Sequence, residues 1–159
     1  MLFRSVARIE LLDADAVRAV NRYSQTTLPE QTLLLMEFHG TDESTKIDIA
    51  ATRDVLERHG GTGLRQTTDE AERRKLWQAR HDTALACRSL VPNARNFATD
   101  VCVPISRLSD CIEETQRDLA DSGLFGPIIG HVGDGNFHVV LSVDPNDHST
   151  VAQIGRAHV

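Results

Sequence analysis

Two histidines in one short stretch are the residues of this sequence whose types and spacing best suit chemistry. The stretch is Gly130-His-Val-Gly-Asp-Gly-Asn-Phe-His138, and its Asp134-Gly135 pair is typical of a two-residue hairpin turn with positive φ at both positions. With that turn, His131 faces His138 directly across the strands, with Cβ atoms about 4.5–5.5 Å apart. Two neutral imidazoles at that separation can bind one divalent metal, but a third ligand must come from elsewhere.

Spacing alone leaves a second interpretation of this hairpin open. The two histidines could instead form hydrogen bonds with each other or with a neighbouring helix. The glycines of the stretch do not match the G-x-G-x-x-G pattern that places a dinucleotide at the start of a helix. The sequence therefore predicts either a metal-binding or a structural histidine pair, and it does not support a phosphate site.

A second candidate group consists of Trp77, Arg80 and His81. Their spacing places them on one face of a predicted helix, so they could line one pocket. A planar guanidinium such as that of Arg80 can bind a carboxylate through two parallel hydrogen bonds. The alternative for Arg80 is a structural ion pair with a nearby acid, Asp82 or Glu72. A single tryptophan near the start of a helix is more typical of a core anchor.

The elements that must position these residues follow from hydrophobic periodicity and turn signals. Ser44, Asp69 and Ser106 suit helix N-caps, while Gly60 and Gly123 suit left-handed helix ends. The order of elements predicts an α+β fold in which helices pack on one face of a mostly antiparallel sheet, with ferredoxin-like elements. Helices are expected over about 9–23, 44–59, 69–90 and 106–122, and strands over 32–39, 62–67, 96–104, 127–131 and 137–143.

Composition excludes several classes of protein. A chain of 159 residues fits one domain. The net charge of -6, with one Trp and one Tyr, argues against a nucleic-acid-binding surface. The longest apolar run, 33–36, is far shorter than the roughly 20 residues that span a bilayer, and residues 1–5 do not resemble a secretory signal. We therefore expect a soluble domain with no nucleic-acid partner and no transmembrane segment.

The three cysteines do not form a recognisable framework. Cys87, Cys102 and Cys111 contain no Cys-x-x-Cys pair, so the sequence predicts neither disulfides nor a thiolate zinc site. A reducing compartment is the simplest setting for such a set. Because Cys111 follows a helical period and Cys102 lies in an apolar strand, we expect them to be buried as small hydrophobic residues.

The two ends of the chain differ in character from the rest. Residues 1–5 and 154–159 resemble translated sequencing adapters, so we expect them to be non-native tails and residues 6–153 to be part of a longer protein. The alternative is that both ends are ordinary frayed termini.

Several motifs, in order along the chain, resemble the C-terminal domain of the FAD-linked oxidases. This family contains the cytochrome-linked D-lactate dehydrogenases, the flavoprotein subunit of glycolate oxidase and D-2-hydroxyglutarate dehydrogenase. The resemblance extends over about residues 6–147. Besides the histidine stretch, it rests on Arg8-Ile-Glu-Leu-Leu-Asp13, Leu34-Leu-Met-Glu-Phe-His-Gly40, Leu76-Trp-Gln-Ala-Arg-His81 and Ala98-Thr-Asp-Val-Cys-Val-Pro-Ile-Ser-Arg-Leu108.

The resemblance implies roles for particular residues. It implies that His131 and His138 lie beside the flavin and hold Zn²⁺ or a similar divalent metal, and that Arg80 binds the substrate carboxylate. Asn136 and Gly135 are the candidate cofactor-binding residues, although Asn136 could instead orient a histidine or be favoured by the turn itself. The implied reaction is oxidation of a D-2-hydroxy acid, such as D-lactate, to the 2-oxo acid. Electrons would pass to a cytochrome or to the quinone pool, in the bacterial cytoplasm, with or without membrane association, or in mitochondria.

The sequence also departs from the family pattern. The family holds FAD chiefly through an N-terminal domain, and it completes the metal site with a downstream Glu-His-Gly motif that supplies the catalytic base; this sequence contains neither. We therefore expect an incomplete fragment that is inactive by itself. The main alternative is a non-catalytic metal- or ligand-binding module, with His39, Glu37 or Asp100 as third ligand. A metal-dependent hydrolase is a further alternative, but the sequence has no His-Glu-x-x-His pattern.

Overall fold

A computed structural model describes residues 6–151 of the chain. The expectations for residues 1–5 and 154–159 lie outside the described residues. The elements, in chain order, are β1 (Val6–Leu12), α1 (Ala14–Ser24), β2 (Leu33–Phe38), α2 (Asp42–Arg58), α3 (Glu70–Ser89), β3 (Arg95–Ala98), β4 (Val101–Cys102), α4 (Ile105–Ser122), β5 (Ile128–His131), the 3₁₀ turn η1 (Val132–Asp134) and β6 (Asn136–Val143).

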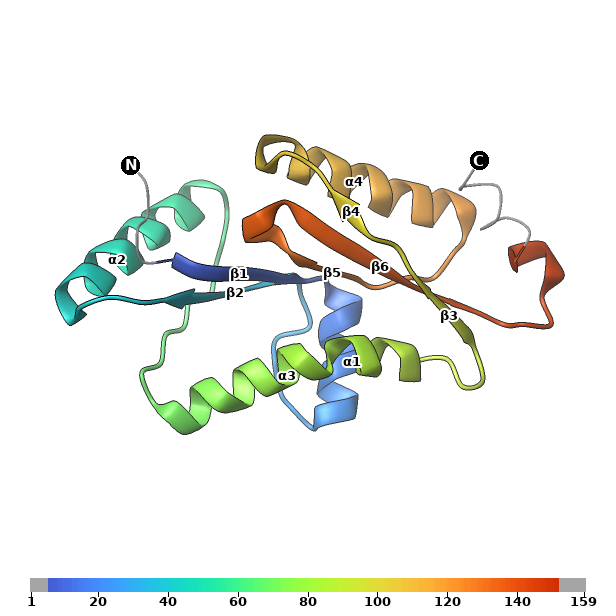
Figure 1. The fold of residues 1–159 in the computed structure, drawn as a ribbon, viewed down its shortest axis with the longest axis horizontal. Helices are drawn as coiled ribbons and strands as arrows, with labels where there is room; N and C mark the ends of the chain where they lie inside the picture. The colour runs from blue at the N-terminus through green and yellow to red at the C-terminus, as the bar shows by residue number, and fades with distance from the viewer. Residues whose placement is uncertain (1–5, 152–159) are drawn as a thin grey trace.

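The strands form one sheet, and all of its paired strands are antiparallel. Their order is β2-β1-β5-β6-β3, and β4 also pairs with β6. The predicted α+β class with a mostly antiparallel sheet is therefore confirmed. In Figure 1, α1 and α3 lie together on one side of the sheet, while α4 lies on the other side, so the expectation that the helices pack on one face only is wrong.

Strand alternation builds a separate core on each face of the sheet, because successive side chains point to opposite sides. Leu12, Ile129 and Val140 pack with the buried residues of α1 and α3. The intervening residues Ile128 and Val139 pack instead with Leu108 of α4 and its neighbours. Both faces of β5 and β6 are thus covered, so the hairpin that carries the two histidines is held from both sides.

The predicted helix over 9–23 is wrong in its first four residues. Residues 9–12 belong to β1, and helix α1 begins at Ala14 after the N-cap Asp13. The Asp13 carboxylate accepts hydrogen bonds from the backbone N–H groups of Ala16 and Ile128, both at 2.8 Å. Burial raises the pKa of the Asp13 carboxyl, against the lowering effect of these hydrogen bonds. Asp13 therefore ends the strand, starts the helix and ties both to β5.

The helix predicted from 69 to about 90 is confirmed as α3. Asp69 is its N-cap, and the Asp69 carboxylate accepts the N–H of Glu72 at 2.8 Å. The helix predicted from Ser44 begins two residues earlier, at Asp42, because Thr41 is the actual N-cap and accepts the N–H of Ser44 at 3.2 Å. Gly60 follows this helix with φ +78°, as predicted for a left-handed helix end.

The helix predicted from Ser106 is also confirmed, with a different start. Helix α4 begins at Ile105 after Pro104, and its N-terminus has no side-chain cap. It ends at the left-handed Gly123, as predicted, with φ +67°. The strand predicted over 62–67 is wrong, since this segment is irregular and pairs with no strand in the described part of the chain.

The strand predicted over 96–104 is divided in two. Strands β3 and β4 are separated at Thr99 and Asp100, although Thr99 still donates its N–H to the carbonyl of Val139 at 3.1 Å. Cys102 lies on short strand β4 and is exposed, so the prediction that it is buried is wrong. Cys111 is partly buried against the core on the α4 side.

Candidate functional site

The histidine hairpin has a different register from the predicted one. His131 pairs with Asn136, and His138 pairs with Ile129, so the two histidines are not directly opposed. The turn is the 3₁₀ turn η1, closed by a hydrogen bond from Gly135 N–H to the Val132 carbonyl at 3.3 Å. Of the Asp134-Gly135 pair, only Gly135 takes a positive φ, +75°, so the predicted two-residue turn is wrong.

The two histidines nevertheless share one face of the sheet. They are diagonal neighbours across β5 and β6, and diagonal neighbours remain within reach of long or aromatic side chains. The ring centroids of His131 and His138 are 6.1 Å apart and the rings are nearly perpendicular, at 88°. The prediction that the two histidines lie close together on one face is therefore confirmed, although the predicted turn is wrong.

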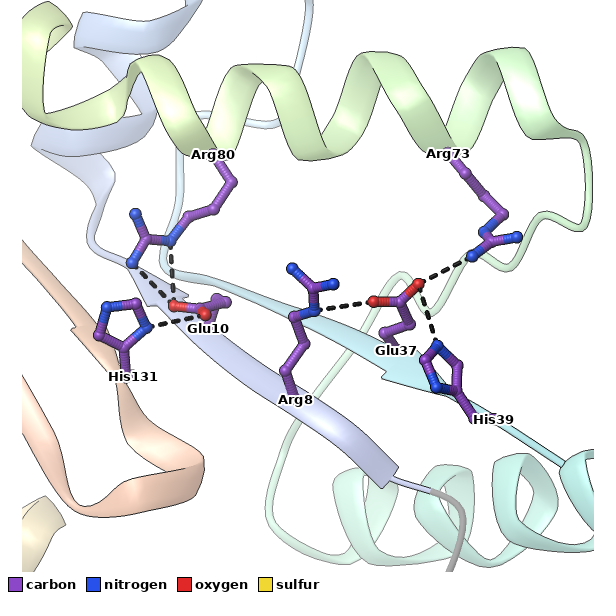
Figure 2. Close-up of polar contacts among 7 residues, drawn as sticks. All are labelled: Arg8, Glu10, Glu37, His39, Arg73, Arg80 and His131. Carbon is purple, nitrogen blue, oxygen red and sulfur yellow. Dashed lines mark hydrogen bonds and ion pairs between the residues drawn. The ribbon is translucent and has the colours of Figure 1, made fainter.

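His131 belongs to a three-residue chain of contacts that includes Glu10 and Arg80. The Nδ1 atom of His131 lies 2.9 Å from Glu10 Oε1. The other carboxylate oxygen, Oε2, accepts hydrogen bonds from Arg80 Nε at 3.1 Å and Arg80 Nη2 at 2.8 Å. Figure 2 shows the Glu10 carboxylate between the two side chains, on the sheet beneath α3. The structural partner of Arg80 is thus Glu10, and not Asp82 or Glu72.

His138 is oriented by the irregular segment between β3 and β4. The His138 Nδ1 atom lies 2.9 Å from the backbone carbonyl oxygen of Thr99. Asn136 supports this segment, because its amide nitrogen donates to Asp100 Oδ1 at 2.8 Å and to the Val101 carbonyl at 3.1 Å. Asn136 therefore acts on His138 through the backbone that it holds in place.

The partners of both histidines determine which nitrogen faces a ligand. A backbone carbonyl and an ionised carboxylate can each only accept a hydrogen bond, so Nδ1 is the donor in both His131 and His138. In each neutral ring, Nε2 then carries the lone pair that a metal ion or a hydroxyl group requires. A carboxylate or carbonyl partner on the other ring nitrogen is the usual support of a metal-binding histidine.

The pair nevertheless provides only part of a metal site. Among residues 6–151, no group of three or more His, Cys, Asp or Glu side chains could hold a metal ion. The Asp100 carboxylate is near His138, at 3.5 Å, but it approaches the Nδ1 atom that already faces Thr99. The residues present fit the nitrogen half of a divalent-metal site and require at least one ligand from outside this range.

A second buried carboxylate lies on the same sheet face, on β2. Glu37 Oε1 is 2.8 Å from Arg73 Nη2 and 3.4 Å from His39 Nε2, and Glu37 Oε2 is 2.7 Å from Arg8 Nε (Figure 2). Burial raises the pKa of the Glu37 carboxyl, but these basic neighbours outweigh it, so the net pKa is lowered. The Arg8 guanidinium also stacks over the Trp77 ring, 4.3 Å from its centroid.

The remaining predicted site residues are placed as follows. Trp77 is half-buried beneath Arg8, whereas His81 is exposed and does not share the buried environment of Arg80. Gly135 has a backbone reason to be glycine. Besides its positive φ, a Cβ atom there would lie 2.2 Å from the Val103 carbonyl oxygen.

Glu10 is the site residue that sequence reasoning missed. The helical period predicted from Ile9 onward obscures the alternation of Arg8, Glu10 and Leu12 toward one face of a strand. The signal that could have revealed it is the acidic residue in that alternating pattern, two positions before a core leucine.

The fold and the site together define an α+β domain with two histidines and a buried arginine–glutamate pair on one face of an antiparallel sheet. Residues 2–157 match the family model described as FAD linked oxidases, C-terminal domain, and the chain belongs to this family.

Individual relatives agree with this assignment. The chain is 42% identical over 149 residues to the probable mitochondrial D-lactate dehydrogenase of Danio rerio and 33% identical over 141 residues to the mitochondrial D-lactate dehydrogenase [cytochrome] of Arabidopsis thaliana. It is 26% identical over 147 residues to the glycolate oxidase subunit GlcD of Escherichia coli K12.

The alignments cover 94%, 89% and 91% of this chain but only 30%, 25% and 29% of the respective relatives. The chain thus spans less than a third of the length of these relatives. In the described part of the chain, no helix combines the length and the apolar character needed to cross a membrane.

Proposed function

We propose that residues 6–153 form the substrate-side part of a longer FAD-dependent dehydrogenase that oxidises a D-2-hydroxy acid, D-lactate or a close analogue, to the 2-oxo acid. The D-lactate dehydrogenase names of the Danio rerio and Arabidopsis thaliana relatives support this substrate class. The observation that carries the proposal is the contact chain from Arg80 through Glu10 to His131, with His138 beside it on the same sheet face. In this arrangement, a cation suited to a carboxylate lies near two imidazole rings whose nitrogens are suited to bind a hydroxyl group.

In this proposal, Arg80 binds and orients the carboxylate of the substrate. Its contacts with Glu10 use Nε and Nη2, and no hydrogen bond of Nη1 is found within residues 6–151. The Nη1 group can therefore donate to a substrate carboxylate while Glu10 keeps the guanidinium plane fixed. A fixed guanidinium holds the α-carbon in one orientation, which is the main contribution a positioning group makes to rate.

His131 and His138 receive the hydroxyl end of the substrate. Their Nε2 atoms can accept the hydroxyl proton in a hydrogen bond or serve as two nitrogen ligands of a zinc-like ion. Two-electron acceptance is the chemistry that FAD supplies when it is bound. The base that removes the hydroxyl proton is proposed to lie outside residues 6–151. Gly135 and Asn136, which border the same hairpin, are the proposed contacts with the flavin.

The proposed electron acceptor is a cytochrome or the quinone pool, and the proposed location is the mitochondrion or the bacterial cytoplasm. The word cytochrome in the name of the Arabidopsis thaliana relative supports the proposed acceptor. The mitochondrial names of several relatives support the proposed mitochondrial location.

The test uses the longer flavoprotein that carries this chain, obtained by reading the gene on both sides of residues 6–153. We expect it to reduce a dye acceptor with D-lactate and not with L-lactate. Arg80→Lys should raise KM for D-lactate more than it lowers kcat, because an ammonium cannot reproduce the guanidinium contact. Arg74→Lys, an exposed position on the same helix, is the control. Equal rates with both enantiomers, or equal KM in both variants, would contradict the proposal.

The alternative of a non-catalytic metal-binding module has a separate test. It requires a third ligand inside the chain, and Glu37 and His39 are engaged with each other and with two arginines. Titration of the 159-residue chain with Zn²⁺ by calorimetry should therefore give weak binding that depends on His131 and His138. Tight binding by the parent chain that is lost in a His131→Ala/His138→Ala variant would favour the module.

A further inference from the structure

We infer that Glu10 is a positioning residue that sets the tautomer of His131 and the orientation of Arg80 at the same time. The contribution of Glu10 to catalysis rests on the proposed function, whereas its effect on the structure does not. One carboxylate serves both neighbours, with Oε1 toward His131 Nδ1 and Oε2 toward Arg80.

The position of Glu10 follows from the strand register. Leu12 pairs with Ile129 and Leu11 with Gly130, so continuing the register by one residue places Glu10 opposite His131. Residues opposite each other in an antiparallel pair point to the same face. The Glu10 carboxylate therefore reaches His131 because β1 pairs with β5, and the paired residues of these two strands lie more than 115 positions apart in sequence.

Because Glu10 is buried, its carboxylate depends on both of these partners. The Glu10 and Arg80 side chains are 9% and 10% exposed, whereas that of His131 is 51% exposed. A buried carboxylate needs its charge balanced and its lone pairs used, and both conditions are met by Arg80 and His131. The half-exposed His131 ring is thus anchored at its inner nitrogen, Nδ1, and leaves Nε2 for a ligand.

The chain contains a matched control for Glu10. Glu37 is also 9% exposed on the same sheet face, and it likewise contacts an arginine of α3 and a histidine. The histidine is His39, however, which approaches through Nε2 at 3.4 Å and is 66% exposed. Glu37 therefore reproduces the burial and the charge of Glu10 without touching the hairpin histidines.

Replacing Glu10 with glutamine gives a sharp expectation for the hydrogen-bond network. Arg80 can only donate, so the single amide oxygen of Gln must face Arg80, and the amide NH₂ group must face His131. His131 Nδ1 then has to accept, which moves the proton of the neutral ring to Nε2. The expected result of Glu10→Gln is an inverted tautomer at His131.

The experiment is a two-bond ¹H–¹⁵N correlation spectrum of the histidine rings in the 159-residue chain at a pH where the rings are neutral. We expect Nδ1–H in His131 and His138 of the parent chain, inversion at His131 alone in Glu10→Gln, and no change at either ring in Glu37→Gln. His138, held by the Thr99 carbonyl, is the internal reference. An unchanged His131 in Glu10→Gln overturns the inference. If Glu10→Gln does not fold, the spectrum of the parent chain tests the inference by itself, because a proton on Nε2 of His131 in that spectrum would also overturn the inference.

The catalytic meaning is tested in the longer flavoprotein. Because loss of a carboxylate partner behind a ligand-binding histidine typically costs about 10–100-fold in affinity or activity, Glu10→Gln should lower kcat/KM for D-lactate by about that factor. Glu37→Gln should leave it unchanged. Tautomer inversion in a protein that does not turn over D-lactate would refute the proposed function and leave the positioning role intact. Turnover unaffected by Glu10→Gln would refute the catalytic role of Glu10 alone.

Discussion

Replacing Arg80 with methionine should destabilise the domain strongly, because it leaves the Glu10 carboxylate buried with only His131 as a partner. Arg80 donates two hydrogen bonds to Glu10 Oε2, and both side chains are about nine-tenths buried. Removing one member of such a pair costs about 3–5 kcal/mol. Since a domain is typically stable by about 5–15 kcal/mol, this loss is a large fraction of the total.

The assay is urea unfolding of the 159-residue chain, followed by circular dichroism. The matched control is Arg74→Met on the same helix, whose partner Glu70 is one turn away and whose side chain is 75% exposed. An exposed pair of this kind contributes about 0–1 kcal/mol, so Arg74→Met should shift the midpoint little. The double variant Glu10→Leu/Arg80→Met should recover part of the loss, because no buried charge then remains unpaired.

Two outcomes would refute this reasoning. Equal midpoints for Arg80→Met and Arg74→Met would mean that the Glu10–Arg80 pair is not buried in solution. Strict additivity of the two changes in the double variant would mean that the two side chains do not interact, since contacting pairs show coupling of about 0.5–3 kcal/mol.

Three further predictions concern pH, packing and thiol chemistry. Burial raises the pKa of the Glu37 carboxyl, but its basic neighbours outweigh burial and hold the pKa below the usual 4.5. The ionised Glu37 therefore stabilises the folded state above pH 4.5, and this stabilisation is lost as the pH falls through the folded-state pKa. Glu37→Gln should therefore reduce the loss of stability on the acid side, and an unchanged pH dependence would refute this. Gly130→Ala should cost about 1–3 kcal/mol or more in thermal melts, because its Cβ would lie 2.7 Å from the β6 backbone, while Gly60→Ala, with nothing within 4 Å, should cost only the left-handed strain of about 1–2 kcal/mol. A disulfide reagent should label exposed Cys102 in the folded chain and Cys87 only on unfolding, because burial raises the pKa of Cys87 to about 12; equal labelling rates would contradict the structure.

Local signals in the sequence were sufficient for most elements. Asp69 is an N-cap, and Gly60 and Gly123 are left-handed helix ends, because these features depend on a few neighbouring residues. The α+β class followed from the order of the predicted elements, and the assignment to the FAD-linked oxidases followed from motifs that are continuous in the chain.

Pairing between distant strands decided what the sequence left open. Residues 9–12 continue the helical period of α1, and only their antiparallel partners, β2 and β5, make them a strand. The turn between β5 and β6 depends on a contact with a distant segment. The Val103 N–H, directly after β4, donates a hydrogen bond to the Gly135 carbonyl at 2.9 Å and so holds the end of β4 against the turn. Local turn preference could not anticipate that contact.

The candidate site divides in the same way. The sequence by itself identified His131, His138 and Arg80 as candidate side chains. Only the tertiary structure decided that Glu10 joins two of them, because a carboxylate 70 residues from the arginine and 121 from the histidine is brought there by the sheet register. Burial then makes the contact obligatory, since a charge removed from water must be paired, and burial is a property of the whole fold.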